Sequence, residues 1–158
     1  MQDKKNIPAF SDVLIAAARI APHAQVTPVL QSRSINELTG AELFFKCENF
    51  QRVGAFKFRG ACNAVWALSE QDARHGVVTH SSGNHGAALA LAAKTRGIPA
   101  YVVVPEGCNI SKVKGIEAAD GKVSYCQATM QARDTAAEKI AQETGAILIH
   151  PFQNPKVI

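Results

Sequence analysis

Long apolar runs and paired cysteines are both missing from this sequence of 158 residues. No stretch reaches the roughly 18 consecutive apolar residues of a membrane-spanning helix, and the polar residues 1–8 lack the apolar segment of a signal peptide. The four cysteines form neither a C-x-x-C pair nor a zinc-ribbon spacing: Cys47, Cys62, Cys108 and Cys126. We therefore expect a cytoplasmic protein without a membrane partner, whose cysteines are reduced thiols in the core.

Basic runs and metal-binding spacings are missing as well. Lys and Arg number 17 against 13 Asp and Glu, which gives a net charge of +4, but these charges are scattered along the chain. The histidines show no H-x-x-x-H or carboxylate-paired spacing on one helix: His23, His75, His80, His85 and His150. The sequence therefore predicts neither nucleic-acid binding nor a metal site, and its mild positive charge favours small anions.

The second half of the sequence alternates short β-branched runs with helical patterns, separated by Gly and Pro. Strands are predicted at 77–80, 101–104, 122–126 and 147–149, and helices at 86–95, from Ser111 onward and at 129–143. Upstream, helices are predicted at 10–18, 34–38 and 60–68, with a strand at 43–47. This order predicts an α/β fold, a three-layer parallel sheet with flanking helices, in which ligands bind beyond the carboxyl ends of strands.

The segment 81–86 (SSGNHG) lies at such an end, between a predicted strand and the helix that follows. Free N–H groups at a helix start attract anions, and glycine lets a ligand approach the backbone. A carboxylate or phosphate group is therefore the expected ligand. An ordinary turn capped by Ser82 or Asn84 is the competing interpretation. The spacing matches neither a Walker loop nor a dinucleotide fingerprint, although Glu106 could act as a ribose-binding acid.

Lys57 stands between Phe56 and Phe58, just before a predicted helix. Apolar neighbours can desolvate an ammonium group and favour a reactive neutral amine. A lysine between aromatic residues is also a common surface arrangement, in which the stem packs on the rings and the charge stays in water. The residue pattern alone leaves both interpretations open.

Three short motifs follow one another along the chain: 46–48 (KCE), 54–60 (GAFKFRG) and 81–86 (SSGNHG). Together they resemble the serine/threonine dehydratase and serine racemase family of fold-type-II pyridoxal-phosphate (PLP) enzymes, whose fold is that of the tryptophan synthase β-chain. The likeness runs from residue 27 to residue 152. It implies pyridoxal 5′-phosphate as the cofactor and a small amino acid as the substrate.

The resemblance also implies a role for each site residue. Lys57 would hold PLP covalently and then take the Cα proton of the substrate as the general base. Phe56 would lie beside the cofactor ring, and Asn84 would hydrogen-bond the ring's 3-oxygen. The substrate carboxylate would be held by backbone amides of the loop: Ser81, Ser82, Gly83, Asn84 and His85.

Two reactions are compatible with the resemblance. Loss of the β-hydroxyl group from L-serine or L-threonine would give an aminoacrylate-type product that hydrolyses after release to a 2-oxo acid and ammonia, which is dehydratase chemistry. Ser82 stands where racemases of the family have a second acid/base, so serine racemisation stays open. Phe152 occupies a position where dehydratases tend to have phenylalanine, which favours elimination. Leu14, Val53 and Ala87 depart from the racemase pattern for nucleotide and metal binding, so neither site is carried over.

The family continues for well over a hundred residues past the end of this sequence, so we expect a truncated member of the fold. Residues 1–75 would be the N-terminal part of the large PLP-binding lobe with Lys57, residues 76–149 the small mobile lobe, and 150–158 the return to the large lobe. A homodimer is the assembly that the family suggests. The alternative is a non-catalytic or truncated α/β module that binds a small anion or a nucleotide at 81–86.

Overall fold

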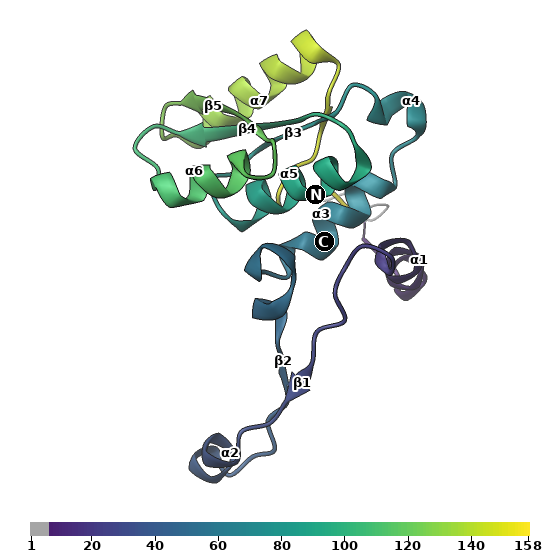
Figure 1. The fold of residues 1–158 in the computed structure, drawn as a ribbon, viewed down its shortest axis with the longest axis vertical. Helices are drawn as coiled ribbons and strands as arrows, with labels where there is room; N and C mark the ends of the chain where they lie inside the picture. Colours follow the sequence, from purple (N-terminus) through teal and green to yellow (C-terminus); the bar gives the residue numbers. More distant parts are fainter. Residues whose placement is uncertain (1–6) are drawn as a thin grey trace.

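The computed structural model describes residues 7–158, so most of the stretch examined for a signal peptide lies outside the described residues. Figure 1 shows a layered body from which an arm projects. The sheet of the body consists of β3 (Val77–His80), β4 (Ala100–Pro105), β5 (Lys122–Cys126) and β6 (Ile147–Leu148). Its strand order is β5-β4-β3-β6, and all three pairings are parallel. The predicted parallel α/β sheet is confirmed.

Helices cover both faces of this sheet (Figure 1). α5 (Asn84–Arg96) and α6 (Ile110–Glu117) lie on one face, and α7 (Met130–Thr144) lies on the other. Alternate strand residues supply the two cores: Val77 points into the larger core with α5, and Val78 into the smaller one with α7. Both valines are fully buried, and burying such a side chain stabilises the fold by about 1.5–3 kcal/mol.

A further helix, α3 (Lys57–Trp66), packs against α5 through small side chains. Ala61 and Ala64 of α3 and Ala88 and Ala92 of α5 all belong to the larger core and are at most 2% exposed. Because alanines allow two helix backbones to lie close together, the start of α3 is held beside the start of α5. This packing brings Lys57 to the segment 81–86.

Several predicted element ends are wrong, for local reasons. α3 begins at Lys57 and α5 at Asn84, in each case earlier than the apolar spacing indicated. α5 is preceded by Gly83 without a side-chain cap, so neither Ser82 nor Asn84 caps it. Asn109 caps α6, because its side chain accepts a hydrogen bond from the backbone N–H of Ser111. The short elements not predicted are α4 (Glu70–Ala73), β1 (Val29–Leu30), η2 (Glu48–Phe50) and η3 (Arg52–Gly54).

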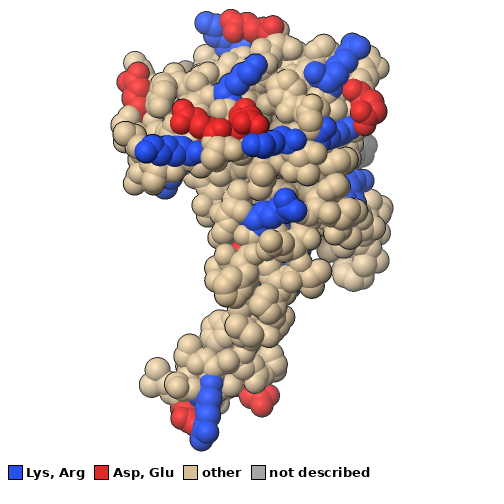
Figure 2. Space-filling model, viewed as in Figure 1, with Lys and Arg blue, Asp and Glu red and all other residues tan. Residues whose placement is uncertain are grey.

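The arm contains β1 paired antiparallel with β2 (Phe45–Lys46), and α2 (Arg33–Thr39) lies at its tip. α1 (Phe10–Ile20) lies beside the base of the arm. Figure 2 shows charged side chains over the body and at the arm's tip, with few between them. The strands of the arm expose their apolar side chains, Val29 by 56% and Phe45 by 42%. The arm therefore leaves apolar surface exposed.

Two further predictions concern the whole chain. Within residues 7–158, no helix is long and apolar enough to cross a membrane. The four cysteines are free, as expected, but only Cys62 is buried. Cys47, Cys108 and Cys126 are partly exposed, because they lie in short or peripheral elements rather than on the inner face of α3. The core-thiol prediction is therefore correct for Cys62 alone.

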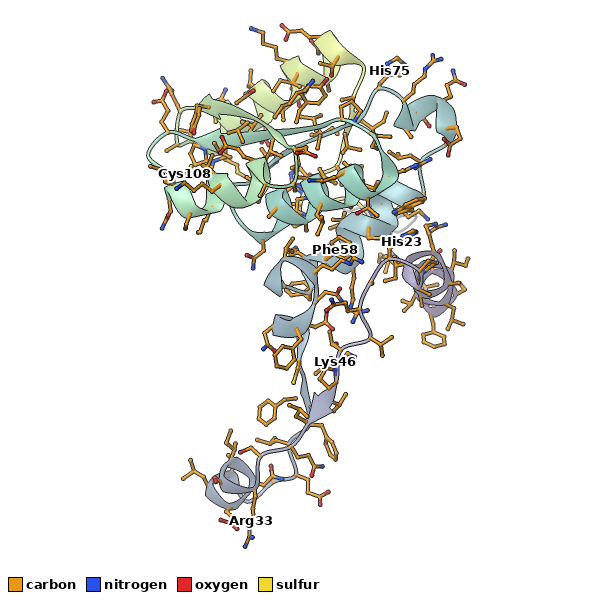
Figure 3. All side chains as sticks on the ribbon, viewed as in Figure 1. His23, Arg33, Lys46, Phe58, His75 and Cys108 are labelled. Atoms are coloured by element: carbon orange, nitrogen blue, oxygen red, sulfur yellow. The ribbon has the colours of Figure 1, made fainter. Side chains whose placement is uncertain are left out.

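An ion pair joins the base of the arm to α3. Nε and Nη2 of Arg59 donate to the two carboxylate oxygens of Glu48 at 2.8 and 2.7 Å, and the Thr27 hydroxyl donates to the same carboxylate at 2.6 Å. The Lys46 amine, labelled in Figure 3, donates to the Thr27 carbonyl at 2.6 Å. Lys46 and Glu48 of the 46–48 segment therefore stabilise the attachment of the arm to the body.

We expect Glu48→Gln to lower the free energy of unfolding by about 1–2 kcal/mol at pH 7, because charge-assisted hydrogen bonds are lost. The hydrogen bond from Arg59 lowers the pKa of Glu48 below its ordinary 4.5, against the opposing effect of burial. A depressed carboxyl pKa contributes stability above pH 4.5 that is lost as the pH falls through the folded-state pKa. The difference between the variant and the parent should therefore shrink below about pH 4.

Urea unfolding at pH 7 and at lower pH measures this difference. Glu37→Gln is the matched control, since Glu37 pairs with Arg33 in an exposed i,i+4 ion pair at the arm's tip. Exposed pairs of this kind contribute about 0.3–0.5 kcal/mol. Equal losses in the two variants, or a Glu48 effect that does not depend on pH, would contradict the assignment.

Candidate active site

The carboxyl end of β3 opens into a cleft of about 480 Å³. The cleft lies where the sequence places its binding loop, between β3 and the start of α5. Every residue predicted for the site lines it: Phe56, Lys57, Ser81, Ser82, Gly83, Asn84 and His85. His80, Lys112 and Arg133 also line the cleft and were not predicted. The fold thus brings two motifs that lie about 25 positions apart in the sequence to one cavity.

Lys57 is the first residue of α3, and its amine lies at the wall of the cleft. The Nζ atom donates to the Pro151 carbonyl at 3.1 Å and lies 5.4 Å from the centre of the Phe56 ring. Phe56 is 59% exposed, whereas Phe58, labelled in Figure 3, is fully buried in the core under Arg52. Of the two interpretations left open by the sequence, enclosure of the amine by both rings does not fit, because successive helical residues point in different directions and only Phe56 lies near Nζ.

The loop before α5 presents backbone donors to the same cleft. The first N–H groups of a helix have no partner within the helix, and the helix dipole adds partial positive charge there. Gly83 holds the loop by donating its N–H to the Ser81 hydroxyl at 3.3 Å. A Cβ atom on Gly86 would lie 2.1 Å from the Ser81 carbonyl oxygen, so only glycine fits. The arrangement suits an anionic group such as a carboxylate.

His85 contributes its backbone to the loop, while its side chain is directed into the protein. The imidazole is buried, and its Nε2 lies 3.4 Å from the Ile149 carbonyl. Burial lowers the pKa of His85 to about 4, so the ring is neutral at pH 7. A carbonyl only accepts, which places the proton on Nε2 and leaves Nδ1 as a buried acceptor without a hydrogen-bond partner.

A second group of side chains meets at the edge of the cleft, and sequence spacing did not reveal it. One potential metal-ligand atom from each of His80, Asp134 and His150 lies within 4.8 Å of the other two. β3 pairs with β6 so that Val78 faces Leu148, and continuing this register places His80 beside His150. The pairing is not readable from local patterns, because β3 and β6 are far apart in the sequence. The prediction that the chain has no metal site stays untested.

The electrostatics of this group favour neutral imidazoles. Burial lowers the pKa of His80, although Asp134 opposes the shift, and burial lowers the pKa of His150 in the same way. Nε2 of His80 lies 3.1 Å from a carboxylate oxygen of Asp134, but the contact lacks hydrogen-bond geometry. His80 therefore keeps a buried ring nitrogen that has no hydrogen-bond partner.

Comparison with known proteins supports the resemblance. The chain is 56% identical over 140 residues to the serine racemase of Arabidopsis thaliana, covering 89% of this chain and 42% of that protein. It is 47% identical over 152 residues to the beta-hydroxyaspartate dehydratase of Paracoccus denitrificans, covering 96% of this chain and 48% of that protein. The chain thus spans a little under half the length of these curated relatives.

Solved structures agree with the sequence comparison. Maize serine racemase superposes with a TM-score of 0.91 at 47% identity, covering 93% of this chain and 45% of that one. The T.th. threonine deaminase superposes with a TM-score of 0.87 at 38% identity, covering 95% of this chain and 47% of that one. The expected fold-type-II architecture and PLP as the family's cofactor are therefore confirmed. Because the family described as pyridoxal-phosphate dependent enzyme matches residues 20–158, nearly all of the described chain, the protein belongs to that family.

Proposed function

We propose that the chain carries one half of an active site that removes water from L-serine or L-threonine and yields a 2-oxo acid and ammonia. The observation that carries the proposal is that the Lys57 amine and the 81–85 loop line one cleft. An amine and an anion site that line one cleft can act on the same small amino acid. The relatives named as dehydratase and deaminase support this reaction class.

The residues present fit PLP. An amine that can attach to the cofactor's aldehyde stands in the cleft, the Phe56 ring is open on that side, and Asn84 is exposed at the start of α5. When bound, PLP supplies an electron sink that stabilises negative charge at Cα. We propose that Asn84 donates to the ring's 3-oxygen and that Phe56 borders the ring.

The chain's own groups would then perform three tasks. Lys57 holds the cofactor and, once displaced, takes the proton from Cα as the general base. The backbone amides of 81–85 hold the substrate carboxylate, which orients the Cα–H bond towards that amine. The β-hydroxyl group then leaves as water with the proton taken from Cα, and the released enamine is hydrolysed to the 2-oxo acid and ammonia. General base assistance of the kind proposed for Lys57 accelerates a step by roughly 10²–10⁴-fold.

Serine racemisation is the second candidate, and the position of Ser82 favours it. The Ser82 side chain lines the same cleft as Lys57 and would be the second acid/base. Relatives named serine racemase add support. Phe152, which also lines the cleft, stands where dehydratases of the family tend to have phenylalanine, so we place elimination first.

The test uses the chain with added PLP. Borohydride reduction followed by peptide mass mapping should find the cofactor on Lys57, and a reductase-coupled assay should detect 2-oxo acid from L-serine and L-threonine. Chiral chromatography of the same samples measures D-serine. Faster formation of D-serine than of 2-oxo acid would favour racemisation, and PLP binding without either product would favour a binding module.

Three other expectations stay proposals. They are the division into lobes at residues 75/76 and 149/150, the homodimer, and the cytoplasmic location. The exposed apolar strands of the arm support association with a second surface. Small amino acids are the proposed substrates because the anion site and the amine both suit them.

A further inference from the structure

We propose that His80, Asp134 and His150 form a binding site for a divalent transition-metal ion of the zinc class. These side chains come from three separate elements: the end of β3, the second turn of α7, and the segment that follows β6. Their potential ligand atoms all lie within 4.8 Å of one another. The proposal goes beyond the proposed elimination reaction, which uses Lys57 and the loop instead.

The buried nitrogen of His80 is the observation that points to a ligand. The side chain is only 2% exposed, and its Nε2 has no hydrogen-bond partner. An unsatisfied polar atom in the interior is destabilising, because it has lost its hydrogen bond to water without gaining another. This atom is directed at the Asp134 carboxylate, 3.1 Å away, in a geometry unsuited to a hydrogen bond. A cation between the two groups would satisfy both.

The distances suit a compact coordination sphere after a small adjustment. Zinc bonds to imidazole nitrogen and carboxylate oxygen are about 2.0–2.2 Å long, which puts neighbouring ligand atoms about 3.3 Å apart. The 3.1 Å separation of His80 and Asp134 is close to this value. Asp134 is 44% exposed, and its side chain can rotate to bring the wider separations into range. The Phe152 N–H donates to Nδ1 of His150 at a long 3.3 Å, so that bond is weak.

The donor set determines the class of metal. Two neutral imidazoles and one carboxylate are typical ligands of Zn²⁺, Co²⁺ and Ni²⁺. Mg²⁺ and Ca²⁺ prefer all-oxygen ligands, and this group offers one carboxylate. Three protein ligands leave a fourth position for water or for an anion. His80 lines the cleft, and so does Arg133, the neighbour of Asp134 in the sequence. The metal would therefore lie at the border of the candidate active site.

Metal binding would link β3, α7 and the segment after β6. Because the ligands converge only in the folded chain, the metal should raise the thermal midpoint by mass action. Within the described residues this is the one group of three or more potential ligands with such spacing. The effect on stability gives a measurement that does not depend on PLP or on catalysis.

Calorimetric titration of the full chain with Zn²⁺, without PLP, tests the proposal. We expect one equivalent to bind and the thermal midpoint to rise. Asp134→Asn and His150→Gln should each raise the dissociation constant at least about tenfold, since even changes around a metal ligand weaken binding that much. Glu138→Gln, an exposed acid on the same helix, should leave it unchanged. Asp134 is partly exposed, so its variant should fold, which circular dichroism checks.

Substitution with Co²⁺ identifies the ligands independently. Nitrogen and oxygen ligands should give a weak visible spectrum without thiolate charge-transfer absorption. A strong thiolate band would assign the metal to a partly exposed cysteine and overturn the proposal. Unchanged affinity in both Asp134→Asn and His150→Gln would overturn it as well, as would the lack of saturable Zn²⁺ binding in the parent chain.

Discussion

Replacing Lys57 with alanine should abolish the borohydride-stable attachment of PLP and lower the rate of 2-oxo acid formation by roughly 10³-fold or more. The magnitude follows from general acid–base catalysis, which contributes about 10²–10⁴-fold, and from the loss of the covalent anchor. Lys57 holds its amine at the wall of the cleft beside the 81–85 loop, and no methyl group can replace it as nucleophile or base.

The structural effect of Lys57→Ala should be small by comparison. The variant loses one hydrogen bond, from Nζ to the Pro151 carbonyl, which contributes about 1 kcal/mol to stability. Urea unfolding separates this loss from the chemical effect. Lys94→Ala is the control, since Lys94 lies on α5 outside the cleft and pairs with Asp120. That variant should keep the attachment of PLP.

Peptide mass mapping decides which amine reacts. Lys112 also lines the cleft, so reduction could in principle fix PLP to either residue. An adduct on Lys112, or one that persists in Lys57→Ala, would contradict the proposed role. A similar rate of elimination in the parent and in Lys57→Ala would show that any activity arises from free PLP in solution.

Replacing Gly86 with alanine should lower the free energy of unfolding by about 3 kcal/mol or more, at the upper end of overpacking effects. The new Cβ would lie 2.1 Å from the Ser81 carbonyl oxygen and 3.1 Å from a methyl group of Val102. The first contact is with backbone, which cannot turn aside as a flexible side chain can. The loop must move, so the attachment of PLP to Lys57 should also weaken in the folded fraction.

Gly115→Ala is the matched control for Gly86→Ala. Gly115 lies inside α6, and a Cβ there meets nothing within 4 Å. Alanine is the better helix former by about 1 kcal/mol, so this variant should be slightly more stable. Urea titrations of both variants and the parent measure the opposite signs. A Gly86→Ala protein as stable as the parent would show that the loop backbone yields freely at this position.

The sequence predicted the strands of the body well because each begins within two residues after a Gly or Pro, and most are short apolar runs. β3 and β5 match their predicted bounds. Element ends were harder, since the start of α3 at Lys57 depends on packing against α5 rather than on the spacing of its own apolar residues. β1 was not predicted because a strand of two exposed residues is too short to show an alternation of apolar and polar side chains.

The candidate site was predictable where its residues are neighbours in sequence. The 54–60 and 81–86 segments each carry a recognisable local pattern, and both lie on one cleft. Their shared position depends on the packing of α3 against α5, for which the sequence offered only an apolar face. The cationic side chains of Lys112 and Arg133 come from α6 and α7, and nothing in their local sequence marks them.

The sequence by itself determined the α/β class and the loop at the end of a strand, and it led to the proposal that Lys57 holds the cofactor. Those features are local, because periodicity, glycine positions and short motifs act within a few residues. Only the tertiary structure decided that β6 pairs with β3, which places His150 beside His80. Strand order depends on the packing of whole elements. It therefore brings together residues that are far apart in the sequence, and the spacing of residues within a segment cannot predict such a site.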